Sequence, residues 1–167
     1  FWRIIIGMGS QPRTRNRQSR IAVNSPGDEM SIRGHVGQTH AQDWEIGARR
    51  TFAVTAERAW QAVMTQPGLG CWLGHAHDLK PAKGVSFVTA EGGHGHIVSF
   101  AEGSLIRLRW QPQGANHVST VQVRVIPASG KATISFHQER LTSAQERTRM
   151  RRYWTGALDQ LAALLTA

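Results

Sequence analysis

The chain has 167 residues, of which 40% are hydrophobic and 19% charged, a composition typical of one globular domain with an apolar core. No apolar run approaches the roughly 20 residues of a membrane-spanning helix, so no membrane span is expected. The net charge is +9, but residues 1–42 alone carry six arginines against two acidic residues. The remaining domain is therefore only moderately basic, which argues against nucleic-acid binding by it.

The one cysteine, Cys71, excludes a disulfide within the chain and is typical of a reducing compartment, so we expect a cytoplasmic protein. A lone cysteine without an evident base is more often a small packed residue than a nucleophile. The sequence contains no Ser-His-Asp order, glycine-rich phosphate loop or H-E-x-x-H motif. It therefore predicts no catalytic residue and no cofactor.

Residues 11–43 show neither helical nor strand periodicity and are rich in Gln, Arg, Ser, Asn and Gly, and we place the boundary of the N-terminal segment at residues 1–43. Such a segment buries too little apolar surface to order itself, so we expect a basic, disordered N-terminal segment. The chain begins with Phe1, and Met30 could be the natural start. In that case residues 1–29 are non-native sequence. The alternative is a genuine basic arm that binds anionic polymers. The folded domain is expected over residues 44–167.

The domain opens with residues 44–55, whose composition predicts a strand ending at Thr55, a suitable N-cap. A short helix is expected over residues 56–64, and one face of it carries Ala59, Trp60 and Val63. This helical pattern is broken by Pro67, Gly68 and Gly70. The next strand is expected over residues 85–91, VSFVTAE.

Three later segments, residues 104–112, 119–127 and 131–141, alternate between apolar and polar side chains. Alternation with period two indicates strands with one dry face and one wet face, and the turn formers between them indicate antiparallel pairing. The dry positions include Ile106, Leu108, Trp110, Val121, Val123, Val125, Ile134 and Phe136.

The chain closes with a long amphipathic helix over residues 143–165. Ser143 and Glu146 have the spacing of a capping box at its start. The basic run RTRMRR lies in the first half of the helix, away from the apolar stripe, and is expected to be solvated. The stripe itself consists of Met150, Trp154, Leu158, Leu161 and Leu165.

Several motifs then follow one another in a recognisable order. They are AERAW in the first helix, Trp72-Leu73-Gly74, Gly95-x-Ile97, LIRLRW ending at Trp110, STVQVRV, FHQERL, and W-x-x-x-L-D-x-L from Trp154 to Leu161. In this order residues 44–167 resemble the SRPBCC superfamily, which comprises START domains, polyketide cyclases and birch-pollen-allergen-like proteins. Within it, the chain is most similar to bacterial relatives of the C-terminal domain of the heat-shock-protein ATPase activator.

The resemblance implies an α+β helix-grip fold. In this fold a curved antiparallel β-sheet wraps around a long C-terminal α-helix, short helices follow the first strand, and a cavity lies between sheet and helix. The alternative is that the apolar residues fill the core and leave no usable space, because apolar periodicity indicates packing first. The expected ligand-binding residues are Trp60, Trp72, Phe87, Leu108, Trp110, Val123, Phe136, Tyr153, Trp154 and Leu158.

Two His-x-His pairs, His75 with His77 and His94 with His96, raise the question of a metal site. A structural metal needs three or four ligands that converge at about 2 Å. The first pair is expected in a loop and the second at the start of a strand, and nothing in the sequence brings the pairs together. We interpret them as polar positions and predict no metal.

These observations leave three hypotheses about function. The first is binding of a hydrophobic or amphipathic small molecule in the cavity. The alternative, implied by the resemblance, is a chaperone-associated protein-interaction module of the stress response. An enzyme of the cyclase, aromatase or hydrolase type is disfavoured, because the inward positions are almost all apolar. We expect a monomer or a homodimer.

Overall fold

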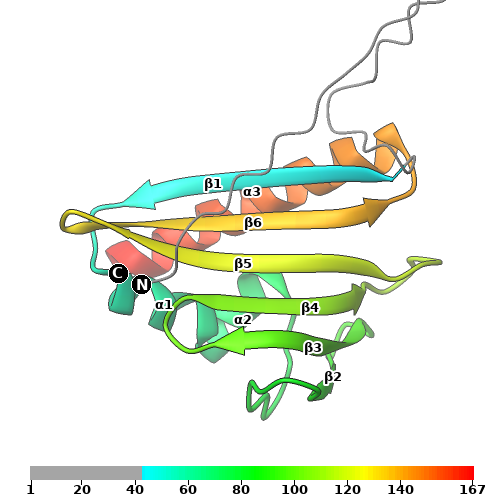
Figure 1. Ribbon diagram of the computed structural model, residues 1–167, viewed down its shortest axis with the longest axis horizontal. Coiled ribbons are helices and arrows are strands. Elements are labelled where there is room, and N and C mark those ends of the chain that lie inside the picture. The colour runs from blue at the N-terminus through cyan, green and yellow to red at the C-terminus, as the bar shows by residue number, and fades with distance from the viewer. Residues whose placement is uncertain (1–42) are drawn as a thin grey trace, which may run out of the picture. The chain divides into compact units, whose positions relative to one another are not determined.

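The computed structural model describes residues 43–167, so the expectations for residues 1–42 lie outside the described part of the chain. This part contains six strands and three helices, in an order close to the one that the sequence predicts (Figure 1). In chain order they are β1 (Trp44–Phe52), α1 (Ala56–Met64), α2 (Gln66–Trp72), β2 (Ser86–Val88), β3 (His94–Ala101), β4 (Leu105–Gln111), β5 (Ser119–Ala128), β6 (Lys131–Leu141) and α3 (Ala144–Thr166).

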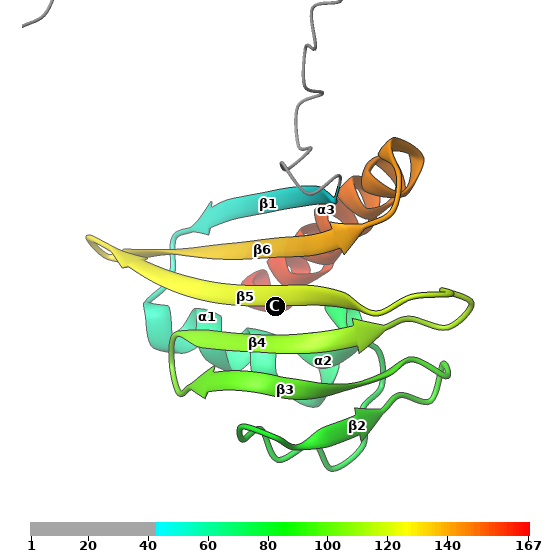
Figure 2. The ribbon, with the colours of Figure 1, turned by 45° about the vertical axis from the view of Figure 1, so that its right-hand side comes forward.

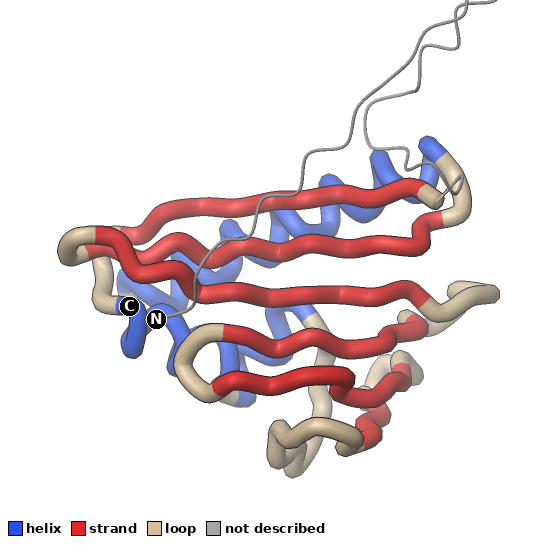
Figure 3. Tube along the Cα trace, viewed as in Figure 1, coloured by secondary structure: helices blue, strands red, loops and turns tan. Residues whose placement is uncertain are grey.

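The six strands form one antiparallel sheet in the order β1-β6-β5-β4-β3-β2. All three helices lie behind this sheet in Figure 1, and the 45° turn of Figure 2 shows the same arrangement. The other face of the sheet is not covered by any helix of residues 43–167 (Figure 3). This curved sheet around a long C-terminal helix confirms the predicted helix-grip fold.

Local signals in the sequence explain where two of the helices begin. Thr55 accepts a hydrogen bond from Arg58 N at 3.2 Å and caps α1, and Ser143 accepts one from Glu146 N at 3.0 Å and caps α3. Side-chain caps of this kind satisfy amide groups that the first helical turn leaves unpaired. Both predicted caps are confirmed. None of the helices in residues 43–167 has the length and apolarity needed to cross a bilayer.

Three local expectations are wrong. The strand expected to end at Thr55 ends at Phe52. Residues around Pro67 do not end the helical region but form the separate helix α2, because proline is tolerated in a first turn, where its missing N–H would have no partner. Gly68 allows α2 to pack against α1, since a β-carbon there would lie 1.6 Å from the Ala62 carbonyl oxygen. The strand expected over residues 85–91 is also shorter, and only Ser86–Val88 pair with β3.

The core lies between the sheet and the helices, and all the dry positions predicted on the strands are buried in it. At its centre Trp154 of α3 stacks on Phe136 of β6, with ring centroids 4.8 Å apart and planes 15° apart. Trp110, Tyr153 and Trp72 extend this aromatic cluster across the sheet. Aromatic rings of this size dominate the burial energy of a core, so the cluster holds α3 on the sheet.

Replacing Phe136 by Ala should lower the free energy of unfolding by about 3–5 kcal/mol, because it removes a fully buried ring and leaves a cavity under Trp154. Urea denaturation measures this difference. The matched control is Ile126→Ala on the exposed sheet face, where the change should stay within about 0.5 kcal/mol. Equal losses for the two variants would contradict this account of the core.

Candidate functional site

A pocket of about 360 Å³ lies at the end of the sheet where β4 turns into β5 and β6 passes into α3. This end is on the right in Figure 1. We call it the hairpin pocket. The first turns of α3 form one wall, and Trp110 and Gln138 close its base. The other wall comes from the β4–β5 hairpin and consists of Pro112, Gln113, Gly114, Ala115, His117 and Ser119.

Gln138 is the polar centre of this base, and only 2% of it is exposed. Its amide nitrogen donates to Ser119 Oγ at 2.9 Å, and its amide oxygen accepts from the Trp154 indole N–H at 2.9 Å. Ser119 in turn donates to the Trp110 carbonyl at 3.1 Å. A buried amide is tolerated only when its polar groups are paired, so this network fixes β4, β5, β6 and α3 relative to one another.

Glu146 brings a carboxylate to the pocket wall with only 8% of the residue exposed. One of its oxygens accepts from the Thr142 amide at 2.7 Å and from the Thr142 hydroxyl at 2.9 Å. The other oxygen lies 3.4 Å from His117 Nε2 and 3.6 Å from an Arg149 guanidinium nitrogen. The carboxylate is therefore anchored through one oxygen and keeps acceptor capacity on the other. The nearby N-terminus of α3 favours its negative charge.

His117, from the β4–β5 hairpin, faces this carboxylate. Its Nδ1 lies 3.2 Å from Asn116 Oδ1. Its Nε2 is buried but forms no hydrogen bond, because the approach to Glu146 at 3.4 Å is poorly aligned. The ring is thus held in the pocket wall with one nitrogen unsatisfied.

The indole N–H of Trp110 is a second unsatisfied group. The residue is 3% exposed, and this N–H is buried without a hydrogen-bond partner. Three other indoles of the domain have partners: Trp60 donates to Glu102, Trp72 to the Val63 carbonyl, and Trp154 to Gln138. Trp110 is therefore the exception among these four buried tryptophans.

Tyr153 of α3 lies against Trp110, with ring centroids 5.9 Å apart, and 39% of the residue is exposed. Its hydroxyl donates to the Trp72 carbonyl at 2.7 Å and so joins α3 to the end of α2. Burial of the hydroxyl, reinforced by the negative charge of Glu91, raises the pKa of Tyr153 to about 12. The side chain is a neutral phenol over the whole physiological range.

A second pocket of about 250 Å³ adjoins the first and shares Trp110, Pro112, Gln113 and Tyr153 with it. We call it the glycine pocket, because three glycines line it: Gly70, Gly74 and Gly93. Residues without side chains keep this space open.

Glu91 brings a carboxylate to the glycine pocket. It accepts a hydrogen bond from the His75 amide at 2.9 Å and contacts Nδ1 of the His75 ring. The hydrogen bond to the His75 side chain lowers the pKa of Glu91 to about 2. The carboxylate is therefore ionised at neutral pH and gives this end of the pocket a negative charge.

Of the ten predicted ligand-binding residues, Trp110 and Tyr153 line both pockets. The other eight are buried in the core, and none of them lines either pocket: Trp60, Trp72, Phe87, Leu108, Val123, Phe136, Trp154 and Leu158. Gln138, Ser119 and His117 were not predicted. The strand alternation could have found Gln138, because it continues the dry series of Ile134 and Phe136.

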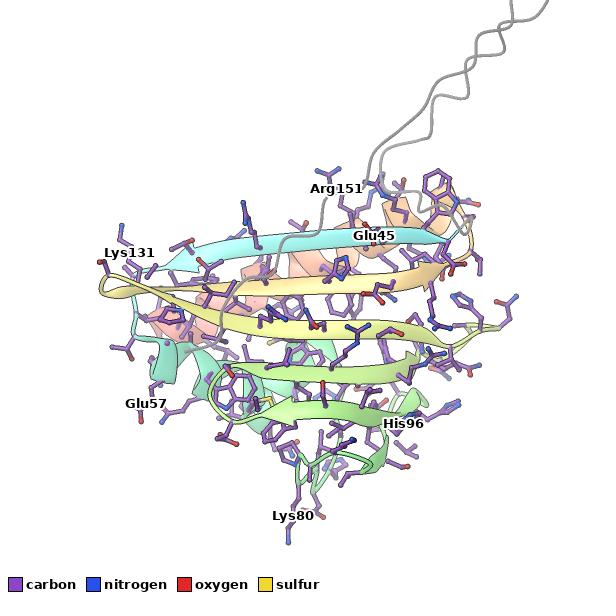
Figure 4. The ribbon with its side chains drawn as sticks, in the orientation of Figure 1. Glu45, Glu57, Lys80, His96, Lys131 and Arg151 are labelled. Atoms are coloured by element: carbon purple, nitrogen blue, oxygen red, sulfur yellow. The ribbon has the colours of Figure 1, made fainter. Side chains whose placement is uncertain are left out.

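The two His-x-His pairs lie on different elements. His75 and His77 are in the loop after α2, and His94 and His96 lie on β3 with their side chains on the uncovered sheet face (Figure 4 labels His96). Among residues 43–167, no three histidine, cysteine, aspartate or glutamate side chains are close enough to hold a metal ion. Cys71 donates from its thiol to the Pro67 carbonyl at 3.2 Å, and burial raises its pKa.

Tyr153 gives a direct test of this geometry, because it is the only tyrosine in the chain. An unfolded tyrosine ionises near pH 10, so tyrosinate absorbance of the folded protein should show a midpoint near 12. Below pH 10 the buried phenol contributes stability, and this contribution is lost as the pH rises from 10 to 12.

The variant Glu91→Gln should move the Tyr153 midpoint part of the way back toward 10, because it removes the second of three causes, which are burial, the charge of Glu91 and the charge of Cys71. Circular dichroism at each pH serves as the control that the fold persists. A midpoint of 10 in a folded chain would show that the Tyr153 hydroxyl is not held as described.

Several solved structures have the same fold as this domain. CalU16 of Micromonospora echinospora is 19% identical, with a TM-score of 0.65 over 77% of this chain and 80% of that one. An HSP90 activator of Plasmodium falciparum, PFC0360w, is 15% identical, with a TM-score of 0.61 over 73% and 96%. The Aha1 dimer of Colwellia psychrerythraea is 12% identical, with a TM-score of 0.60 over 72% and 95%. At these identities the likeness establishes the fold alone.

The sequence itself gives the family. No curated protein matches the chain. The family model described as Activator of Hsp90 ATPase homolog 1-like protein, however, matches residues 53–166, which is most of the domain. The resemblance found in the sequence motifs is thereby confirmed, and the chain belongs to the family of activator of Hsp90 ATPase homolog 1-like proteins.

Proposed function

We propose that this domain binds an amphipathic small molecule in the hairpin pocket. One observation carries the proposal. Within residues 43–167, two buried side-chain nitrogens have no hydrogen-bond partner, Trp110 Nε1 and His117 Nε2, and both residues line this pocket. Folded proteins pair nearly all their buried polar groups, so two unpaired groups on residues that line one pocket support a ligand that supplies a partner.

The walls of the pocket define the kind of ligand. Trp110, Met150 and Tyr153 offer an apolar surface, and the Glu146 carboxylate and the Arg149 guanidinium add polar groups at the α3 side. A volume of about 360 Å³ is in the lower range of small-molecule sites, which run from about 300 to 1,000 Å³. These features fit a small molecule with a flat apolar body and one or two polar groups.

The same residues favour binding over catalysis. Both polar groups of the Gln138 amide are engaged by Ser119 and Trp154, and the Tyr153 hydroxyl donates to a backbone carbonyl. The raised pKa of Tyr153 keeps its proton in place, so the phenol is a poor general base at neutral pH. The polar groups at the base thus have structural partners.

The uncovered face of the sheet supports a second candidate, a protein-interaction module. This face carries four arginines, Arg49, Arg107, Arg109 and Arg124, and two glutamates, Glu45 and Glu139 (Figure 4 labels Glu45). Both glutamates lie beside His137, and Glu139 also pairs with Arg107 at 2.9 Å. No acidic residue of 43–167 pairs with Arg49 or Arg124, which flank Ser135 on neighbouring strands.

A basic face of this kind complements an acidic protein surface. Two structurally similar proteins are described as an HSP90 activator and as an Aha1 dimer. By analogy, we propose that an Hsp90-type chaperone is the partner that contacts this face.

The small-molecule proposal predicts that N-phenyl-1-naphthylamine, a neutral amphipathic fluorophore, binds the full chain with an increase in fluorescence. Ala115→Trp should abolish the increase, because the indole fills the pocket from its hairpin wall. Ala115→Ser is the matched control and should bind as the unmodified chain does. An increase that survives in Ala115→Trp would place the probe elsewhere, and no increase in any variant would refute the proposal.

The chaperone proposal predicts that the full chain changes the ATP hydrolysis rate of the source organism's own Hsp90. Arg49→Glu combined with Arg124→Glu should remove this effect, because both positions then repel an acidic surface. The control, Arg151→Glu with Arg152→Glu, changes the net charge equally on exposed positions of α3. Equal behaviour of the two double variants would exclude the uncovered face as the contact.

A further inference from the structure

The atoms around the unpaired indole N–H of Trp110 indicate which kind of ligand group could pair with it. A β-carbon added to Gly93 would lie 3.5 Å from Trp110 Nε1, 3.2 Å from Thr89 Oγ1 and 3.6 Å from the Gln111 carbonyl oxygen. Gly93 therefore stands beside the N–H where any other residue would place a side chain. Both Gly93 and Trp110 line the glycine pocket, so the missing side chain of Gly93 leaves the buried N–H close to this pocket.

The neighbouring polar side chains are already engaged. Thr89 Oγ1 accepts from the Gly93 amide at 3.1 Å, and the Glu91 carboxylate is held by the amide and ring of His75. The Tyr153 hydroxyl donates to the Trp72 carbonyl. An indole N–H is a donor only, so its missing partner must be an acceptor atom.

The charge of the pocket narrows the class of acceptor. The Glu91 carboxylate lines the same pocket and is ionised at neutral pH, so it repels a ligand carboxylate, sulfonate or phosphate. A neutral carbonyl oxygen meets no such repulsion. The rings of Trp110 and Tyr153, inclined at 40° to each other, provide the apolar wall beside it.

We propose that Trp110 Nε1 donates a hydrogen bond to a neutral carbonyl oxygen of the ligand in the glycine pocket, so that the domain selects aromatic ketones and related neutral carbonyl compounds. The inference rests on the proposed function, because the ligand body occupies the adjoining hairpin pocket. Trp110 and Tyr153 line both pockets and allow one molecule to reach from the first into the second.

A matched pair of probes tests the selection: 2-acetylnaphthalene, and 2-ethylnaphthalene, which has the same shape without the oxygen. Their affinities for the full chain are measured by displacement of N-phenyl-1-naphthylamine and by chemical-shift titration of the indole N–H signals. The ketone should bind about tenfold more tightly, because the hydrocarbon leaves the buried donor unpaired. The Trp110 indole proton, assigned by its absence in Trp110→Phe, should shift downfield only with the ketone.

Two variants isolate the hydrogen bond. Trp110→Phe retains an aromatic ring but removes the donor, and Gly93→Ala places a methyl group in front of the donor. Both should reduce the preference for the ketone to about equal affinity. Gly156→Ala, on α3 with open space around it, is the control and should keep the preference.

The outcomes separate the inference from the proposed function. A tenfold preference that both variants remove, with the downfield shift, supports the inference. Equal affinity of the unmodified chain for the two naphthalenes, or an unmoved Trp110 signal, overturns it and leaves binding in the hairpin pocket standing. If N-phenyl-1-naphthylamine and both naphthalenes fail to bind, the proposed function and the inference fall together.

Discussion

The buried amide of Gln138 is the constraint on which the arrangement of this domain depends. An amide side chain that is cut off from water needs a donor and an acceptor within the protein, because burying it unpaired destabilises the fold. Ser119 and the Trp154 indole meet that requirement. Both contacts depend on the register of β5 against β6 and on the position of α3 over the sheet, so the amide favours the observed packing.

This packing determines where space remains. Trp154 stacks on Phe136, and Trp110 and Tyr153 pack at its edge, so the aromatic cluster occupies the middle of the layer between sheet and α3. Both pockets discussed above lie at the margin of this cluster, where the β4–β5 hairpin and the loop after β2 approach α3. These two pockets are lined by the β4–β5 hairpin, the loops after α2 and β2, α3 and a few strand residues, of which Trp110 alone was predicted. Most of the predicted lining residues are part of the core.

The two sides of the sheet differ in chemistry as well as in covering. The covered side has carboxylates at the two pockets, Glu146 and Glu91, each beside a histidine. The uncovered side carries arginines that outnumber its glutamates. Successive residues of a strand point to opposite faces, so the side chains of one face can differ in chemistry from those of the other. A small molecule at the pockets and a protein partner at the uncovered face would therefore contact different surfaces.

The sequence by itself determined which apolar strand residues are buried, where two helices begin and to which family the chain belongs, because periodicity, side-chain caps and motif order are local properties of the chain. It also identified Trp110 and Tyr153 as ligand-binding candidates. Only the tertiary structure decided that Gln138 meets Ser119, that His117 faces Glu146, and that the Trp110 indole lacks the partner which Trp60, Trp72 and Trp154 each have. Alternation assigns a side chain to one face of a strand, but its hydrogen-bond partner depends on register and helix position, which arise only when distant segments pack together.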